Sequence, residues 1–253
     1  MNITTVAFTL IQIFSLLGCA CNPAGAIRPS REPAAAYILD LPPSLENQRT
    51  EYAVVIDTAI LRVNDRFRSW GYSTPPGGYF THVIVFDNGT QAKVTLAKAF
   101  STDTSNIPES FSGTVSESTL YVVSKELYRP IWEKMYPEWK WSESETYRSL
   151  MIHEIAHSEH AYIARTQFGS EDAMGPEWFF EGLAMACANQ FPVGPNAQTR
   201  MEKEEIVLFL TVTTKPTVPY PFYARVVWSL LNRYSAKILI EHGKDDGFLN
   251  LLR

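Results

Sequence analysis

The stretch His153-Glu154-Ile155-Ala156-His157 decides how the rest of this chain is interpreted. On a helix, which turns by about 100° per residue, positions four apart return to the same face. His153 and His157 can therefore present two imidazoles to one metal ion. Glu154 is offset around the same helix, where a carboxylate would face a metal-bound water as a general base does. The alternative is a solvated helix that carries two surface histidines.

A third metal ligand is expected further along the chain. A catalytic zinc site usually has three protein ligands and a water, and the third ligand is often a carboxylate. Glu181 is the candidate, in the stretch Trp178-Phe179-Phe180-Glu181-Gly182-Leu183-Ala184. Gly175-Pro176 predicts a helix start, with Pro176 at the first helical position, where its missing N–H costs nothing. The apolar residues of this helix would dock it against the histidine helix.

Together the two stretches resemble the gluzincin metallopeptidases, a peptidase MA-like group that includes thermolysin-like enzymes and the zinc aminopeptidases. Their pattern is HExxH and then, about twenty residues or somewhat more later, P-x-W-x-x-E-G-x-A, whose Glu is the third ligand. The residues that match are His153, Glu154, His157, Pro176, Trp178, Glu181, Gly182 and Ala184. The resemblance covers roughly residues 145 to 235. It implies an α+β, zincin-like (thermolysin-like) catalytic domain, with a mixed α/β N-terminal half that contains an edge strand and a mainly helical C-terminal half.

Other residues compete for the ligand positions. A metzincin would need a glycine where this chain has His160 and a histidine where it has Ile163, so that zinc arrangement is excluded. His160 lies one turn beyond His157, and we interpret it as a surface imidazole or one that supports the ligands rather than as a ligand. Glu177 lies one turn before Glu181, but the Glu-Gly-x-Ala context of the family belongs to Glu181.

The family also stabilises the oxyanion with a tyrosine, carried on a later helix with a pattern like Y-x-x-G-A-x-V. Aligning Ala224 and Val226 with this pattern puts Tyr220 at the catalytic position. Tyr223 then stands where the family usually has glycine, and it is the second candidate for the same role. In the alternative interpretation both tyrosines simply pack beside Phe222.

The resemblance implies a mechanism and a substrate class. One zinc ion per chain would be held by His153, His157 and Glu181, and Glu154 would activate the bound water for attack on a peptide carbonyl. The substrate would be a peptide or protein. The G-x-M-E-N motif with which the aminopeptidases of the group bind a free amine is missing here, which favours an endopeptidase.

Two questions stay open from the sequence. Thermolysin-like members orient a histidine with an Asp one turn after the ligand Glu, and Met185 stands there in this chain. The residue that has this role here is not identified by the sequence. The second hypothesis for function is a non-catalytic cell-envelope protein for binding or assembly that retains the zincin fold, and the intact Glu154 argues against it.

Residues 1–26 predict export. They contain no charged side chain and carry an apolar run from Val6 to Leu17 that is too short for a membrane span, as is typical of a signal peptide. The end of this run, Leu16-Leu17-Gly18-Cys19, resembles a bacterial lipobox, in which Cys19 would be lipidated and attached to a membrane. Ala24-Gly25-Ala26 would suit ordinary cleavage instead. Both routes lead to the cell envelope or the exterior.

The remaining chain is expected to be a linker and one domain. Residues 27–50 are rich in proline and predict an extended linker. Residues 51–253 predict a single zincin-like domain, because a chain of 253 residues with 45% hydrophobic content can bury a substantial core. A net charge of −5 without a basic stripe argues against a nucleic-acid partner.

Local patterns predict the elements of this domain. Turn signals and β-branched content favour strands or mixed segments over Tyr52–Ile56, His82–Phe86, Lys93–Leu96 and Thr119–Val123. Helices are expected over Ile60–Trp70, Met201–Leu210, Pro221–Tyr234 and Ala236–His242. Ser142 with Glu145 predicts a capping box that opens the histidine helix, and Gly169 predicts its C-terminal stop.

Overall fold

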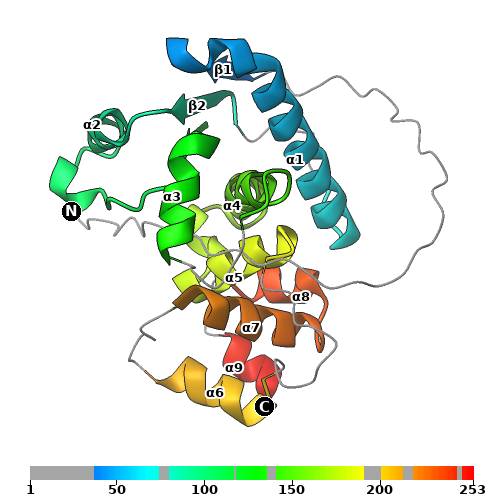
Figure 1. Ribbon diagram of the computed structural model, residues 1–253. Coiled ribbons are helices and arrows are strands. Elements are labelled where there is room, and N and C mark those ends of the chain that lie inside the picture. The colour runs from blue at the N-terminus through cyan, green and yellow to red at the C-terminus, as the bar shows by residue number, and fades with distance from the viewer. Residues whose placement is uncertain are drawn as a thin grey trace.

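The computed structural model describes residues 37–73, 80–116, 118–135, 141–190, 201–212, 219–243 and 247–253. The predicted signal peptide and Cys19 lie outside these residues. Within them, the chain is mixed α and β, with a small sheet towards one end of the molecule and a group of helices at the other (Figure 1).

The strands are short, and the helices make up most of the described chain. The strands are β1 (Ile38–Asp40), β2 (His82–Phe86), β3 (Gly113–Ser116) and β4 (Thr119–Val123). The helices are α1 (Arg49–Ser69), α2 (Gly89–Ala99), α3 (Lys125–Met135), α4 (Thr146–Phe168), α5 (Glu177–Cys187), α6 (Lys203–Thr211), α7 (Pro219–Leu231), α8 (Ala236–Glu241) and α9 (Gly247–Leu252). Three 3-10 segments are η1 (Pro43–Gln48), η2 (Thr104–Asn106) and η3 (Glu171–Met174).

The sheet has the order β1-β2-β4-β3, in which β1, β2 and β4 are parallel and β3 runs antiparallel to β4 at one edge. Val83 of β2 lies opposite Leu120 of β4, and Tyr121 of β4 lies opposite Thr114 of β3. Helix α1 makes the crossover that joins β1 to β2, as a parallel pair requires. The sequence predicts an edge strand in this half, and β3 is the edge strand that contacts α4.

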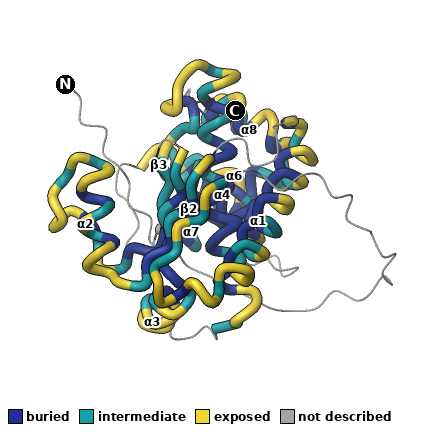
Figure 2. The backbone as a smooth tube through the Cα atoms, turned by 90° about the horizontal axis from the view of Figure 1, so that it is seen from above, coloured by how far each residue is buried: buried dark blue, intermediate teal, exposed yellow. Residues whose placement is uncertain are grey.

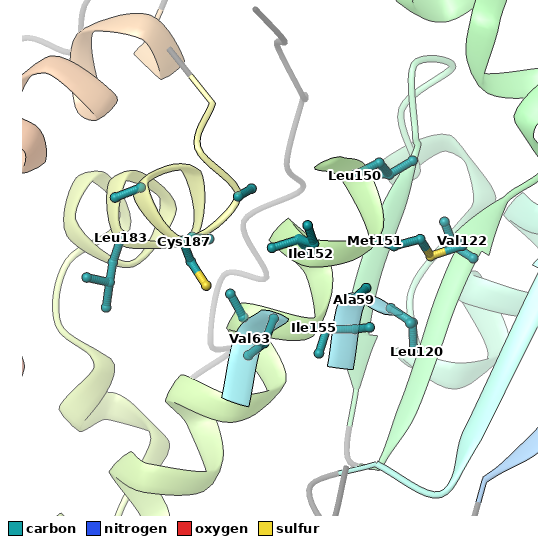
Figure 3. Close-up of a cluster of buried hydrophobic side chains, with 14 of the residues drawn as sticks. Ala59, Val63, Leu120, Val122, Leu150, Met151, Ile152, Ile155, Leu183 and Cys187 are labelled. Atoms are coloured by element: carbon teal, nitrogen blue, oxygen red, sulfur yellow. The ribbon is translucent and has the colours of Figure 1, made fainter. Parts of the chain in front are cut away.

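Helix α4 lies in the middle of the molecule, between the sheet with α1 on one side and α5 on the other (Figures 1 and 3). In Figure 3, Met151 and Ile155 of α4 lie towards β4 and α1, whereas Ile152 lies towards Cys187 of α5. All four side chains are buried. Since full burial of a side chain such as isoleucine stabilises by roughly 1.5–3 kcal/mol, this packing fixes α4 against both neighbours.

The two ends of α4 differ in how well they were predicted. Gly169 ends the helix in the left-handed conformation with φ +84°, as its position predicts. The capping box predicted from Ser142 and Glu145 is wrong, because Glu145 is the N-cap residue and its side chain makes no capping hydrogen bond. Instead, the hydroxyl of Thr146 accepts a hydrogen bond from the Ser142 N–H at 3.0 Å.

The first half contains more helix than the sequence patterns predict. His82–Phe86 and Thr119–Val123 form β2 and β4 as expected, but Tyr52–Ile56 lies in α1 and Lys93–Leu96 lies in α2. The buried hydrophobic residues of α1 recur three or four positions apart: Tyr52, Ile56, Ala59, Ile60, Val63 and Phe67. This helical period outweighs the β-propensity of the valines and isoleucines, because packing of one continuous face decides the conformation.

The predicted linker over residues 27–50 is also too long. Ile38–Asp40 forms β1 and pairs with β2, and η1 follows at Pro43–Gln48 with Leu45 buried. Arg49 already belongs to α1. Prolines therefore occur in packed structure here. Pro43 is the first residue of a 3-10 segment, a position at which a backbone N–H would have no hydrogen-bond partner within the segment.

The second half is helical, as predicted, and the ends of the expected helices from Met201 onwards agree with those of α6, α7 and α8 to within three residues. Figure 2 shows the buried residues concentrated around α4 and the sheet, whereas α2 lies at the periphery with much of its surface exposed. No helix among the described residues combines the length and apolar character needed to cross a membrane.

Candidate metal centre

The side chains of His153, His157 and Glu181 converge where α4 passes α5. His153 Nε2 lies 3.0 Å from His157 Nε2 and 3.2 Å from Glu181 Oε2. His157 Nε2 lies 3.5 Å from the same carboxylate oxygen. In a tetrahedral site with metal–ligand distances of about 2.0–2.2 Å, the ligand atoms would be about 3.4 Å apart. The three atoms therefore fit around one ion of the size of zinc, and among the described residues this is the group of three that could hold a metal.

Helix α5 brings Glu181 to the two histidines. Pro176 is its N-cap residue, so the helix begins one residue later than predicted, at Glu177. The next residue after the ligand, Gly182, has a packing role: a Cβ there would lie 2.4 Å from Val227 Cγ2 and 2.7 Å from the Tyr223 carbonyl oxygen. Glycine therefore allows α7 to approach α5 directly beside Glu181.

Burial and charge define the chemistry of the ligand group. His153 and Glu181 are fully buried, whereas the His157 side chain is 13% exposed. Burial alone would raise the pKa of Glu181, but the neighbouring imidazoles of His157 and His153 outweigh it and lower the pKa to about 2. Glu181 thus stays a carboxylate, the form in which it could bind a cation.

Glu154 lies in the same interior but is not part of the ligand group. It is completely buried, and within the described part of the chain neither carboxyl oxygen has a hydrogen-bond partner. Burial raises the pKa of Glu154 to about 8, with His153 opposing the rise and Glu181 adding to it. An unsatisfied buried carboxyl group costs stability, so packing alone does not account for Glu154 at this position.

The edge strand β3 passes directly over Glu154. A Cβ built on Gly113 would lie 2.6 Å from both Cγ and Cδ of Glu154, closer than atoms can approach. Glycine at this position therefore gives the Glu154 side chain its room. It also leaves the β3 backbone beside the carboxyl group with no side chain between them.

Gly113→Ala is expected to keep the fold and to displace the Glu154 carboxyl group. The clash is with side-chain atoms of Glu154 from Cγ outward, which rotation about the Cα–Cβ bond can move, so the backbone need not move. Because misplacing a catalytic group by about 1 Å can cost about 10²-fold, catalysis that depends on Glu154 should fall about tenfold or more. Gly89→Ala is the matched control, since a Cβ on Gly89 meets no atom within 4 Å. Equal catalytic rates for the two variants would contradict the proximity argument.

The two candidate tyrosines lie together on α7. Tyr220 and Tyr223 are buried, and their rings are in T-shaped contact with centroids 5.9 Å apart. Burial, together with the charges of Glu177 and Glu181, raises the pKa of Tyr223 to about 12. The Tyr223 hydroxyl therefore stays protonated at neutral pH. The oxyanion role stays a prediction for both residues.

His160 and Gln190 complete the surroundings of the ligand group. His160 is buried, its ring lies 5.9 Å from that of Phe179, and burial lowers its pKa to about 3. The interpretation of His160 as a surface imidazole is therefore wrong. Gln190, which no sequence motif singles out, lies with Oε1 3.0 Å from Nδ1 of His153. Its position follows from the turn after α5 and not from any spacing in the ligand motif.

No protein-family model matches this sequence, and neither a characterised protein nor a solved structure is significantly similar to it. The site therefore has to be interpreted from its own geometry and from the motif resemblance.

Proposed function

We propose that this chain is a zinc metallopeptidase of the gluzincin type. The observation that carries the proposal is the convergence of His153, His157 and Glu181, from two helices, on a space that suits one tetrahedral ion. A zinc ion held by these three side chains would act as a Lewis acid that lowers the pKa of a water molecule and polarises a carbonyl group. Two imidazoles and one carboxylate are one of the ligand sets of catalytic zinc sites with an open position.

Glu154 supplies the proton transfers in this proposal. Its buried carboxyl group has a pKa of about 8 without a cation nearby, and a dication beside it would favour the carboxylate. As general base it takes the proton of the attacking water, and as general acid it returns that proton to the leaving amine. Tyr223 or Tyr220 would donate its hydroxyl hydrogen to the oxyanion that forms on the former carbonyl oxygen. Both tyrosines stay candidates for this role, since both are buried on α7 and their rings are in contact.

The edge strand β3 would bind the substrate. Its backbone lies beside Glu154, and an extended peptide can add to a free sheet edge by main-chain hydrogen bonds. Recognition of backbone groups within a chain suits an endopeptidase. The export predicted from residues 1–26 would then put cleavage in the cell envelope or outside the cell, on peptide or protein substrates.

A peptide-library digestion tests the proposal. Purified protein with one equivalent of zinc is expected to cleave internal peptide bonds, and incubation with a chelator is expected to abolish cleavage until zinc is added back. The cleavage sites, determined by mass spectrometry, would also distinguish an endopeptidase from an exopeptidase. A protein that binds zinc stoichiometrically and cleaves nothing would instead favour a non-catalytic binding or assembly role. Cleavage that survives complete removal of the metal would overturn the metallopeptidase proposal.

A further inference from the structure

The hydrogen bond between His153 and Gln190 fixes which ring nitrogen of His153 carries the proton. Gln190 Nε2 donates to the carbonyl oxygen of Ser149 at 3.4 Å, and a carbonyl can only accept. The amide is thereby oriented with its oxygen towards His153, 3.0 Å from Nδ1. An oxygen acceptor at this distance requires Nδ1 to be protonated. The lone pair of Nε2 is then free, and Nε2 is the nitrogen that lies beside His157 and Glu181.

The end of helix α5 holds Gln190 in this position. Asn189 adopts the left-handed conformation with φ +53°, which asparagine tolerates better than most residues. The N–H of Gln190 donates to the Met185 carbonyl at 2.8 Å, and the N–H of Asn189 donates to the Ala186 carbonyl at 3.3 Å. This pair of bonds is the Schellman arrangement that ends many helices. The helix that carries the ligand Glu181 therefore also turns its own C-terminal end back onto the ligand His153.

A third contact ties this end to the neighbouring helix. The indole N–H of Trp228 on α7 donates to the Gln190 carbonyl oxygen at 3.3 Å, and the Gln190 side chain is buried. Backbone and side chain of Gln190 are thus held independently, the backbone by Met185 and Trp228 and the amide by Ser149. A buried side chain held in this way can orient a neighbouring imidazole without loss of rotamer freedom on metal binding.

We propose that Gln190 is the positioning residue of the zinc site, which selects the Nδ1–H tautomer of His153 and aims Nε2 at the ion. This inference rests on the proposed zinc site. It answers the question that Met185 leaves open, since no carboxylate stands one turn after Glu181 in this chain. A neutral amide does the same work without adding a charge to an interior where Glu154 and Glu181 are already fully buried.

Two substitutions of Gln190 separate orientation from simple packing. Gln190→Met keeps the length of the side chain and removes the acceptor, and it is expected to weaken zinc binding by about 10–100-fold. Gln190→Glu keeps the acceptor for Nδ1 and loses the donor to Ser149. If the hydrogen bond that residue 190 accepts from His153 Nδ1 is what matters, the zinc affinity of Gln190→Glu should lie within a few-fold of the wild-type value. If Gln190 only fills space, Gln190→Glu should be the worse variant, because it buries a charge against a carbonyl oxygen.

Zinc affinity is measured on the folded, full-length protein by competition with a chromophoric chelator, and the Co²⁺ absorption spectrum reports the ligand geometry. Gln91→Met is the matched control, since it makes the same chemical change at an exposed position on α2; its zinc affinity should equal that of the wild type. Unchanged zinc affinity in folded Gln190→Met would overturn the inference, and so would weaker binding in Gln190→Glu than in Gln190→Met.

The readout also distinguishes this inference from the proposed function. A loss of zinc affinity in Gln190→Met, in a protein that cleaves no peptide, would support the positioning role and contradict the peptidase. Unchanged zinc affinity in Gln190→Met, in a protein that does cleave peptides, would contradict the positioning role and support the peptidase. A wild-type protein that binds no zinc would overturn both.

Discussion

Glu154→Gln is expected to bind zinc as the wild type does and to cleave peptides about 10²–10⁴-fold more slowly, the usual contribution of a general acid or base. The amide has nearly the same shape as the carboxyl group, so it fits the space that Gly113 leaves. It cannot accept a proton from water, and His153, His157 and Glu181 keep their positions. Steady-state cleavage of a peptide substrate, together with the zinc content of the same sample, measures both parts of this result.

Glu181→Ala is the contrasting variant, because it removes a ligand and not the base. We expect it to lose zinc as well as activity, since two histidines alone leave the site one protein ligand short. The pair therefore assigns separate roles to two carboxylates that are both fully buried. Stoichiometric zinc in purified Glu181→Ala would remove Glu181 from the ligand set. Full activity in Glu154→Gln would remove Glu154 from the mechanism.

The pairing of His153 with His157 could be predicted from the sequence, because helix geometry alone determines it. His153 and His157 are one turn apart on a single helix, so their convergence needs no tertiary information. Glu181 required the additional assumption that two helices pack together, and the apolar residues of α5 supported that assumption. The structure brings all three side chains to one point. The identity of the ion and the reaction stay predictions.

What surrounds the ligand group could not be predicted, because it depends on contacts between distant elements. Gln190 reaches His153 through a left-handed turn at Asn189, and nothing in the local sequence requires the chain to turn back there. Gly113 lies forty-one residues before Glu154, and only the sheet order places it above that side chain. Both residues owe their roles to the tertiary structure rather than to a motif.

The errors in secondary structure have a common physical cause. Tyr52–Ile56 was predicted from residue preferences over a short window, in which valine and isoleucine favour strands. Its helical period becomes visible only over the whole of α1, where the buried face continues to Phe67. Leu45 shows the same effect in the predicted linker, since its burial against the core stabilises a segment whose prolines indicate an extended chain. In both segments the conformation is determined by packing against distant parts of the chain rather than by local residue preferences.

The metal-free protein is expected to lose stability as the pH rises from about 4.5 to about 8, and Glu154→Gln is expected to remove most of this loss. The Glu154 carboxyl group has a pKa of 4.5 when it is exposed, as in the unfolded chain, and burial raises this pKa to about 8 in the folded protein. Between these values the unfolded chain has released a proton that the folded protein still binds. Raising the pH therefore favours unfolding across this window and has no further effect through Glu154 above it.

Glu181 contributes with the opposite sign and in a different window. Its pKa is lowered from 4.5 to about 2 in the folded protein, so its contribution to stability is lost as the pH falls from about 4.5 to about 2 and is constant above 4.5. A decrease in the free energy of unfolding between pH 5 and pH 8 therefore reports on Glu154 and not on Glu181.

Urea unfolding of both proteins in chelator, at several pH values from 5 to 8.5, measures this difference. Each unit of pKa shift corresponds to about 1.4 kcal/mol, so the free energy of unfolding of Glu154→Gln should exceed that of the wild type by a few kcal/mol more at pH 8 than at pH 5. Saturating zinc should reduce the pH dependence of the wild type, because a dication beside Glu154 favours its carboxylate form. Parallel curves for the two metal-free proteins would mean that Glu154 is solvated in the folded state. A difference in the free energy of unfolding that grows with pH, and that zinc removes, would mean that the buried Glu154 carboxyl group destabilises the metal-free protein. It would also mean that a bound metal ion relieves this cost by favouring the carboxylate that serves as the base.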